Sequence, residues 1–258
     1  MKFQAHRGVS TEFPENTMIS YQAAVDQGYE IIELDPKYTK DGHFVMLHDH
    51  SLKRTARDQS GEAVDVLIAD ITLEEARTYD YGIWKGEEFK GTQIPTLLEV
   101  LDFAKNNPGI HIKIDNVWEK FPEDLQDKLL TELAEYGVGA SLGLSCTTYE
   151  CTEKVVRALS GATVHFDGID MSEETLIKVA EICKGHELYF WVMGKTQKPK
   201  WFKGENASVE LCERVKKYGH LGVWILSTQE ELDRAANVFG ADCIETNGQL
   251  KPRMLNAE

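Results

Sequence analysis

The chain has 258 residues, of which 42% are hydrophobic, and carries a formal net charge of −15 at pH 7. This acidity argues against nucleic acid as a partner, because binding a polyanion requires a basic surface. No apolar run approaches the roughly 18 residues of a membrane-spanning helix, and the first residues lack the apolar core of a secretory signal. We therefore expect a cytoplasmic protein without stable membrane insertion.

Extended apolar runs alternate with helical patterns along almost the whole chain. The first two strands are expected over Phe3 to His6 and over Ile31 to Leu34. The helix between them carries apolar side chains from Met18 to Val25 and ends at Gly28. A further extended run, Phe44 to Leu47, follows the second strand.

A long polar insertion is then expected from about residue 51 to residue 93. Inside it, Thr72 and the glutamates that follow predict the start of a short helix. Ile94-Pro95-Thr96 leads into a longer helix, and the third strand follows over Ile110 to Ile114. Five further strands are expected over Leu142 to Ser145, Thr163 to Ile169, Leu188 to Met193, Leu221 to Leu226 and Asp242 to Glu245, with helices near 123–136, 149–159, 173–184, 207–218 and 229–239.

Strict alternation of strands and helices predicts a parallel sheet of the α/β class. Eight repeats in this length favour a closed (β/α)8 TIM barrel with a small insertion after the second strand. The alternative is a doubly wound sheet, but no GxGxxG turn follows the first strand to support it. No linker divides the chain, so we expect a single domain over 1–258 with its insertion at about 51–93. Barrel active sites lie at the carboxyl ends of the strands.

Two carboxylates stand at the carboxyl end of the second strand. Glu33 and Asp35 are two residues apart, so an extended backbone points both side chains to the same face. Carboxylates this close repel each other unless a cation lies between them or one is protonated. Oxygen ligands suit Mg²⁺ and Ca²⁺, and the buried strand before the pair makes a metal site more plausible than the motif alone does; a surface acidic pair is the alternative.

Two histidines and an arginine stand at the ends of other extended runs. Cleavage of a phosphodiester needs a base for the nucleophile and an acid for the leaving alkoxide, and histidine can serve in either role. His6 and His48 are the candidates for these roles. Arg7 offers a planar fork that can hold two phosphate oxygens.

The third strand alternates isoleucines with polar residues. His111, Lys113 and Asp115 would all point to one face. Polar side chains inside a barrel are costly unless they serve a site. The third strand is therefore expected to contribute to the same site.

Together these segments resemble the glycerophosphodiester phosphodiesterase family. The resemblance is carried by HRG at 6–8, PENT at 14–17, ExD at 33–35, DG at 41–42, HD at 48–49, RT at 54–55 and IPTL at 94–97, and it continues through Trp224 to CIETN at 243–247. It implies a TIM barrel that hydrolyses small glycerophosphodiesters, such as glycerophosphocholine, to sn-glycerol 3-phosphate and an alcohol.

The resemblance also implies a role for each matching residue. These roles are His6 and His48 as the general acid/base pair, Glu33 and Asp35 as ligands of a divalent metal ion (Mg²⁺ or Ca²⁺), and Arg7 and Lys113 as phosphate contacts. Trp224 would wall the glycerol side of the pocket, although ordinary barrel packing is an equal alternative. A metal-bound glycerol hydroxyl would attack phosphorus, and water would then open the cyclic phosphate.

The third strand departs from the family pattern. The family has Glu-x-Lys there, whereas the matching positions here are His111 and Lys113. Three arrangements are open. His111 replaces the glutamate as the third ligand, which would admit Mn²⁺, Zn²⁺ or Fe²⁺; Asp115 contributes instead, although it lies roughly 6.6 Å further along the strand; or the metal is held weakly. We expect His111. A second departure is Thr246-Asn247 in place of the usual Thr-Asp.

Two other functions remain as alternatives. One is a lysophospholipase D or sphingomyelinase D-like phosphodiesterase, which would need an apolar interfacial surface, for which residues 81–84 are the candidate. The other is a weakly active or non-catalytic relative that binds a phosphate ligand through Arg7 and Lys113. The presence of both histidines argues against the second alternative, whereas His111 argues for it.

Overall fold

The computed structural model of the chain describes residues 1–137, 139–195, 199–200 and 202–252. Eight parallel strands close into a barrel, which confirms the predicted (β/α)8 fold. The order around the barrel is β1-β10-β9-β8-β7-β6-β5-β2. The barrel strands are β1 (Lys2–His6), β2 (Ile31–Leu34), β5 (His111–Ile114), β6 (Leu142–Cys146), β7 (Thr163–Phe166), β8 (Leu188–Met193), β9 (His220–Leu226) and β10 (Cys243–Thr246).

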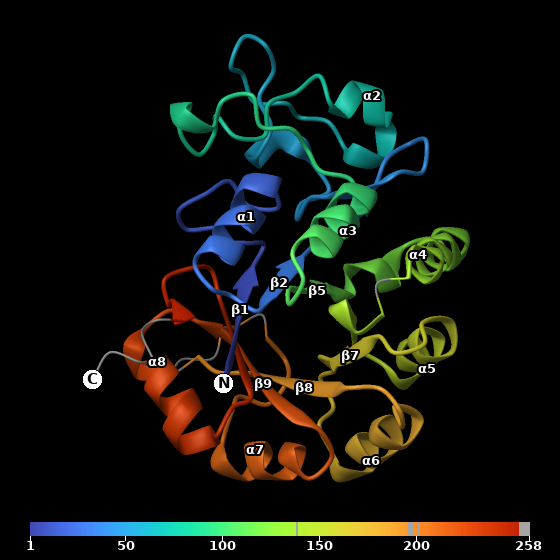
Figure 1. The fold of residues 1–258 in the computed structure, drawn as a ribbon, viewed down its shortest axis with the longest axis vertical. Coiled ribbons are helices and arrows are strands. Elements are labelled where there is room, and N and C mark those ends of the chain that lie inside the picture. The colour runs from blue at the N-terminus through green and yellow to red at the C-terminus, as the bar shows by residue number, and fades with distance from the viewer. Residues whose placement is uncertain (138, 196–198, 201, 253–258) are drawn as a thin grey trace.

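Helices surround the barrel, and each covers part of its outer face (Figure 1). They are α1 (Met18–Asp26), α3 (Leu97–Asn106), α4 (Glu123–Tyr136), α5 (Tyr149–Ala158), α6 (Glu173–Ile182), α7 (Val209–Lys216) and α8 (Gln229–Arg234). The main apolar core lies between these helices and the strands, as shown by Leu101, Leu129 and Val215, which are all fully buried. Among the described residues, no helix is long and apolar enough to cross a bilayer.

The extended run at Phe44 forms a strand outside the barrel. This strand, β4 (Phe44–Met46), pairs antiparallel with β3 (Pro36–Tyr38), which directly follows β2. The backbone N–H of Leu47 donates to the carbonyl of Asp35 at 2.9 Å. The hairpin therefore returns the chain to the carboxyl end of β2, and His48 comes next.

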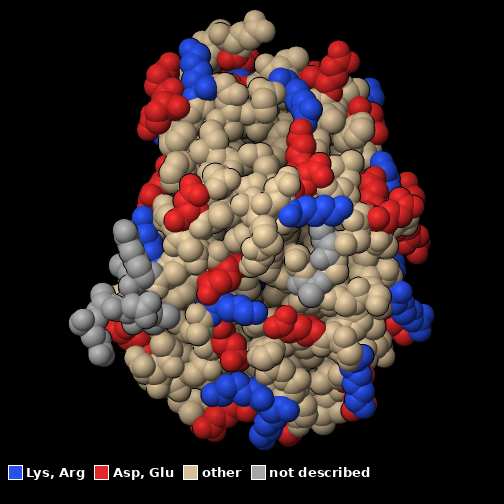
Figure 2. Space-filling view, viewed as in Figure 1, with Lys and Arg blue, Asp and Glu red and all other residues tan. Residues whose placement is uncertain are grey.

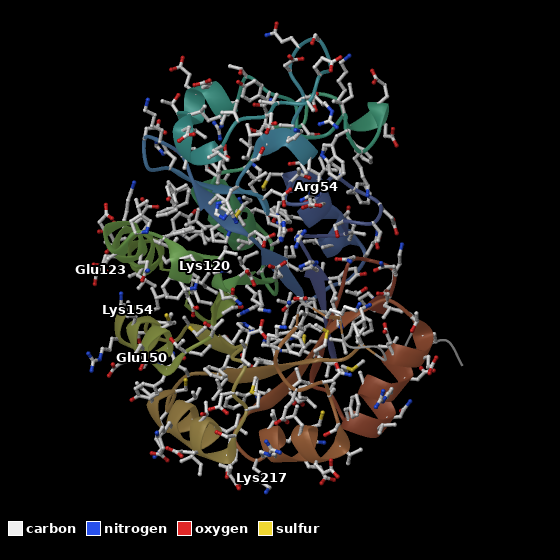
Figure 3. All side chains as sticks on the ribbon, turned by 180° about the vertical axis from the view of Figure 1, so that it is seen from behind. Arg54, Lys120, Glu123, Glu150, Lys154 and Lys217 are labelled. Carbon is white, nitrogen blue, oxygen red and sulfur yellow. The ribbon has the colours of Figure 1, made fainter. Side chains whose placement is uncertain are left out.

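The 51–93 segment packs around a second apolar core, which it shares with the residues that flank it. It includes α2 (Leu73–Ala76), whose start at Thr72 was predicted, and it gathers at one end of the molecule beyond α1 and α3 (Figure 1). Its buried core consists of Val45, Leu47, Leu52, Ala56, Val64, Ile68, Ile71, Ala76, Tyr81 and Ile94. Arg54 lies where this segment meets the N-terminal part of the chain (Figure 3).

The predicted strand from Thr163 to Ile169 is shorter in the structure. β7 ends at Phe166, and Ile169 is 63% exposed. Asp170 accepts hydrogen bonds from the backbone N–H and the hydroxyl of Ser172, which caps α6. This turn replaces the last part of the expected strand, so Asp167 stands at the carboxyl end of β7.

We expect Thr96→Ala to lower the free energy of unfolding by about 1 kcal/mol, because α3 loses its N-cap. Thr96 accepts a hydrogen bond from the Glu99 backbone, and Glu99 reaches back to the Thr96 backbone N–H at 2.8 Å. Urea unfolding measures the change. Thr96→Ser keeps the hydroxyl and is the control; an equal loss in both variants would show that the cap is not the cause.

Candidate active site

Three carboxylates meet at the carboxyl ends of β2 and β5. Each of Glu33, Asp35 and Asp115 offers an oxygen, and these oxygens lie within 4.8 Å of one another. Glu33 and Asp35 are buried, and Asp115, which directly follows β5, is half-buried. Strand register explains the convergence, because Glu33 pairs with Lys113 and His6 pairs with Glu33.

The electrostatics of this cluster suit a cation. Burial raises the pKa of Glu33 well above its usual range, and the Asp35 and Asp115 carboxylates raise it further. Burial and Asp35 likewise raise the pKa of Asp115. Burial also opposes ionisation of Asp35, but the Arg7 guanidinium, the two histidines and the Asn16 hydrogen bond together outweigh it and lower the pKa of that carboxyl. Three oxygen donors that repel one another when ionised are a fitting ligand set for a hard divalent cation.

The structure does not bring His111 to this cluster. His111 pairs with Ile31, at the amino end of the barrel. Its Nε2 lies 3.1 Å from Nε2 of the buried His165, whose Nδ1 accepts a hydrogen bond from Trp191. That bond leaves the proton of His165 on Nε2, which donates to His111 Nε2. Asp115, the other candidate for the third ligand, lies beside Glu33 and Asp35 instead.

Arg7 is held by carboxylates on two sides. Its Nε lies 3.0 Å from Asp35 and its Nη1 lies 3.2 Å from Glu15. Its backbone N–H donates to the Glu33 carboxylate at 3.0 Å. The turn requires a positive φ of 60° at Arg7 and 76° at Gly8, where a Cβ would lie 2.4 Å from Ser20 Oγ. The chain therefore bends sharply to direct Arg7 at the cluster.

Asn16 orients Asp35. Its amide nitrogen donates to the Asp35 carboxylate at 2.8 Å, while its amide oxygen accepts from the Tyr21 hydroxyl at 3.1 Å. Asn16 also has a positive φ, 55°, which asparagine tolerates better than most residues. The PENT segment thus supports the site through hydrogen bonds to groups that reach the mouth of the barrel.

His6 is oriented by a residue from the other end of the chain. Its Nδ1 lies 2.6 Å from Asn247 Oδ1, and its Nε2 lies 3.8 Å from Glu33. Because an amide oxygen can only accept, His6 Nδ1 carries the proton in this arrangement. The Asn247 position, a departure from the family pattern, therefore directs Nε2 of His6 towards the carboxylates.

His48 has a carboxylate partner on its own segment. Its Nδ1 lies 2.6 Å from Asp49 Oδ1. Asp49 also accepts from Arg54 Nε at 2.7 Å, and these two hydrogen bonds help to lower the pKa of Asp49 to about 2. Arg54 in turn holds both oxygens of Glu15 at 2.7 Å each. The insertion is thereby tied to the residues beside both Arg7 and His48.

Lys113 lies in the barrel interior. It is buried, its Nζ is 3.6 Å from Glu245, and it stands 4.0 Å from the centre of the Trp191 ring. Burial works against its charge, but the surrounding carboxylates, Glu245 and Asp167 foremost, together raise the pKa of Lys113. The expected phosphate lysine is thus already neutralised by a buried carboxylate.

Trp224 stands on β9, and Asp167 directly follows β7. Trp224 packs partly buried against a cluster that contains Trp191, and Phe202 meets its ring edge-on at 5.5 Å. Burial raises the pKa of Asp167 to about 7, although Lys113 and a hydrogen bond from Trp224 favour its ionised form. Trp224 and Phe202 therefore bring aromatic rings to this part of the barrel, and Asp167 adds a carboxyl group.

Several residues around the site had no role in the sequence-based prediction. They are Glu15, Asn16, Asp49, Arg54, Asn247 and Asp167. Glu15, Asn16, Asp49 and Arg54 all lie inside the motifs PENT, HD and RT, so the motifs contained the signal. Asn247 was noted only as a departure, and Asp167 was placed within a strand.

The comparisons with known proteins agree with this geometry. A model of the glycerophosphoryl diester phosphodiesterase family matches residues 6–183. A glycerophosphodiester phosphodiesterase of Caldanaerobacter subterraneus subsp. tengcongensis is 30% identical over 248 residues, covering 94% of this chain and 92% of the relative. A human lysophospholipase D is 36% identical over 122 residues, covering 45% of this chain and 37% of the relative.

Solved structures share the fold. A phosphodiesterase of Oleispira antarctica, in complex with the product sn-glycerol-3-phosphate, superposes with a TM-score of 0.74 at 22% identity, covering 96% of this chain and 94% of that chain. A glycerophosphodiester phosphodiesterase from Agrobacterium tumefaciens superposes with a TM-score of 0.69 at 19% identity, covering 96% of each chain. The chain therefore belongs to the glycerophosphoryl diester phosphodiesterase family, whose enzymes are phosphoric diester hydrolases.

Proposed function

We propose that the protein hydrolyses glycerophosphodiesters to sn-glycerol 3-phosphate and an alcohol, with a divalent metal ion and the two histidines. One observation supports this most directly: Glu33, Asp35 and Asp115 converge at the barrel end where β1 ends in His6. Arg7 lies between Asp35 and Glu15 at the same end. Metal ligands, acid/base groups and a phosphate cation are all needed for this reaction.

The metal would be held by Glu33, Asp35 and Asp115. An all-oxygen set of carboxylates favours Mg²⁺ or Ca²⁺, whereas a His111 ligand would favour Mn²⁺ or Zn²⁺. When bound, the ion would polarise the phosphate and make the glycerol hydroxyl more acidic. Asn16 keeps Asp35 in its position through a hydrogen bond of 2.8 Å, and Arg7 does so through an ion pair of 3.0 Å.

The two histidines carry the protons. In the first stage one imidazole accepts the proton of the attacking glycerol hydroxyl, and the other donates a proton to the departing alkoxide, which leaves a cyclic phosphate. In the second stage water attacks phosphorus and the ring bond between phosphorus and the attacking glycerol oxygen breaks. One imidazole accepts the proton of the water and the other returns a proton to that glycerol oxygen, so both histidines return to their first state. Asn247 and Asp49 hold the Nδ1 atoms of His6 and His48, which leaves the Nε2 atoms for these transfers.

A water-soluble head group fits better than a lipid surface. Tyr81 in the candidate interfacial segment is 3% exposed, and its hydroxyl donates to the carbonyl of Ala76. Trp84 lies beside two cations, with Arg54 at 6.0 Å and Lys85 at 5.8 Å from its ring. The 81–84 segment thus presents a mixed surface, and the lysophospholipase D alternative gains no support from it.

We expect the purified protein to release glycerol 3-phosphate from glycerophosphocholine with added Mg²⁺ or Ca²⁺. His6→Ala and His48→Ala should each lower kcat by about 10²-fold or more, because each removes a proton-transfer group. Metal binding, measured by mass spectrometry of the native protein, should persist in both. No turnover with Mg²⁺, Ca²⁺, Mn²⁺ or Zn²⁺ would contradict the proposed function.

The third ligand is tested by a pair of variants. Asp115→Asn should weaken metal affinity by about tenfold or more, because one charged oxygen ligand is lost. His111→Asn should leave that affinity within about twofold, because His111 lies at the amino end of the barrel. Calorimetric titration with Mg²⁺ and Mn²⁺ measures both. The reverse ranking would restore His111 as the ligand.

Asn247 offers a test of histidine orientation. Asn247→Ala removes the acceptor for His6 Nδ1, so kcat should fall by about tenfold or more with the metal affinity unchanged. Asn247→Asp, which has the residue found in many family members, keeps an acceptor there and should retain most of the activity. Equal activity of Asn247→Ala and the wild type would show that this hydrogen bond does not direct the reaction.

A further inference from the structure

Two lysines are buried near the site, and their surroundings differ. Lys113 and Lys37 are each 3% exposed. Lys113 has a carboxylate partner, Glu245, and an aromatic ring beneath it. Among the described residues, no carboxylate lies within ion-pair distance of the Lys37 ammonium, whose one hydrogen bond is a long one of 3.5 Å to the carbonyl of Pro36. A buried ammonium with so little compensation is costly unless a ligand completes it.

Lys37 follows the carboxylate cluster in the chain, on the hairpin strand β3. It lies two residues after Asp35, so an extended backbone points both side chains to one face. Burial lowers the pKa of Lys37, and the charges that oppose this are Asp35, Asp115 and Asp49, while Arg7 adds to the lowering. Its charged neighbours are therefore two of the proposed metal ligands, the partner of His48, and Arg7.

Charge balance supports a cation at this point. The three cluster carboxylates and Asp49 carry four negative charges when ionised, and a divalent cation with Arg7 and Lys37 would supply four positive ones. Lys113 with Glu245 and Arg54 with Glu15 cancel in pairs. Without Lys37 the same site would carry a net negative charge and would repel a phosphodiester anion.

We propose that Lys37 is a phosphate-binding residue, donating to a non-bridging oxygen of the substrate beside the metal site, and that Lys113 instead maintains the barrel interior. This inference rests on the proposed function of the same site. For this role the Lys37 ammonium only has to exchange its weak hydrogen bond to the Pro36 carbonyl for a stronger one to a charged phosphate oxygen.

A role in neutralising the carboxylates predicts different behaviour. If Lys37 served only to offset the charges of Glu33, Asp35 and Asp115, its removal would tighten metal binding and leave the affinity for a phosphate ligand unchanged. If it binds phosphate, its removal weakens the phosphate ligand in the metal-loaded protein. The affinity for sn-glycerol 3-phosphate therefore separates the two roles.

The test is calorimetric titration of the Mg²⁺-loaded protein with sn-glycerol 3-phosphate and, separately, inorganic phosphate. Lys37→Met should weaken both affinities by about tenfold or more, since one charged hydrogen bond is lost, and lower kcat/KM for glycerophosphocholine by a similar factor. Lys37→Arg should recover part of the binding. Lys53→Met, which removes a lysine in an exposed pair with Asp65, is the matched control and should behave as the wild type.

Lys37→Met with unchanged affinity for both phosphate ligands would overturn the inference. If Lys37→Met does not fold, the wild-type protein decides: the Lys37 ammonium ¹⁵N resonance, assigned by its absence from Lys37→Arg, should shift when sn-glycerol 3-phosphate is added. An unshifted resonance with the ligand bound also overturns it. Wild-type protein that binds phosphate but never cleaves a diester would instead refute the proposed function alone.

Discussion

Mutual repulsion among Glu33, Asp35 and Asp115 is the constraint around which this end of the barrel is organised. Three carboxylates with oxygens within 4.8 Å of one another destabilise the fold when all are ionised, unless positive charge is placed beside them. The chain places Arg7 there by a sharp turn after β1, and Asn16 fixes Asp35 by a hydrogen bond. Charge elsewhere is well mixed: Figure 2 shows acidic and basic side chains interspersed over the visible face.

The sequence predicted the architecture, and it pointed to much of the candidate site, because both depend on periodicity. Alternating strands and helices identified the barrel, and position at a strand end made His6, Glu33 and Asp35 candidates. The exception is the third strand. His111, Lys113 and Asp115 share one face, so the two-residue period alone does not tell which of them stands level with Glu33. Pairing with β2 decides it, and places Lys113 beside Glu33 and His111 two residues earlier, beside Ile31.

The supporting hydrogen bonds were beyond reach for a different reason. Asn247 and His6 are separated by 241 residues, and Arg54 and Glu15 by 39, so no local pattern joins them. Their contacts follow only from barrel closure, which brings β10 beside β1, and from the docking of the 51–93 segment. The motifs indicate that positions such as Glu15 and Arg54 are important, but only the closed barrel shows which residues they contact.

The clamp formed by Glu15 and Arg54 has a consequence for how this enzyme could diversify. Glu15 contacts Arg7 in the barrel mouth and Arg54 in the insertion, while Arg54 also holds the aspartate that orients His48. The 51–93 segment is therefore not an interchangeable module. Changes to this segment that alter which leaving group fits would also shift Arg7 and His48. Substrate specificity and reaction rate would therefore change together. Substitutions in the part of the insertion farthest from Arg54 avoid this coupling, and they should therefore disturb the candidate site least.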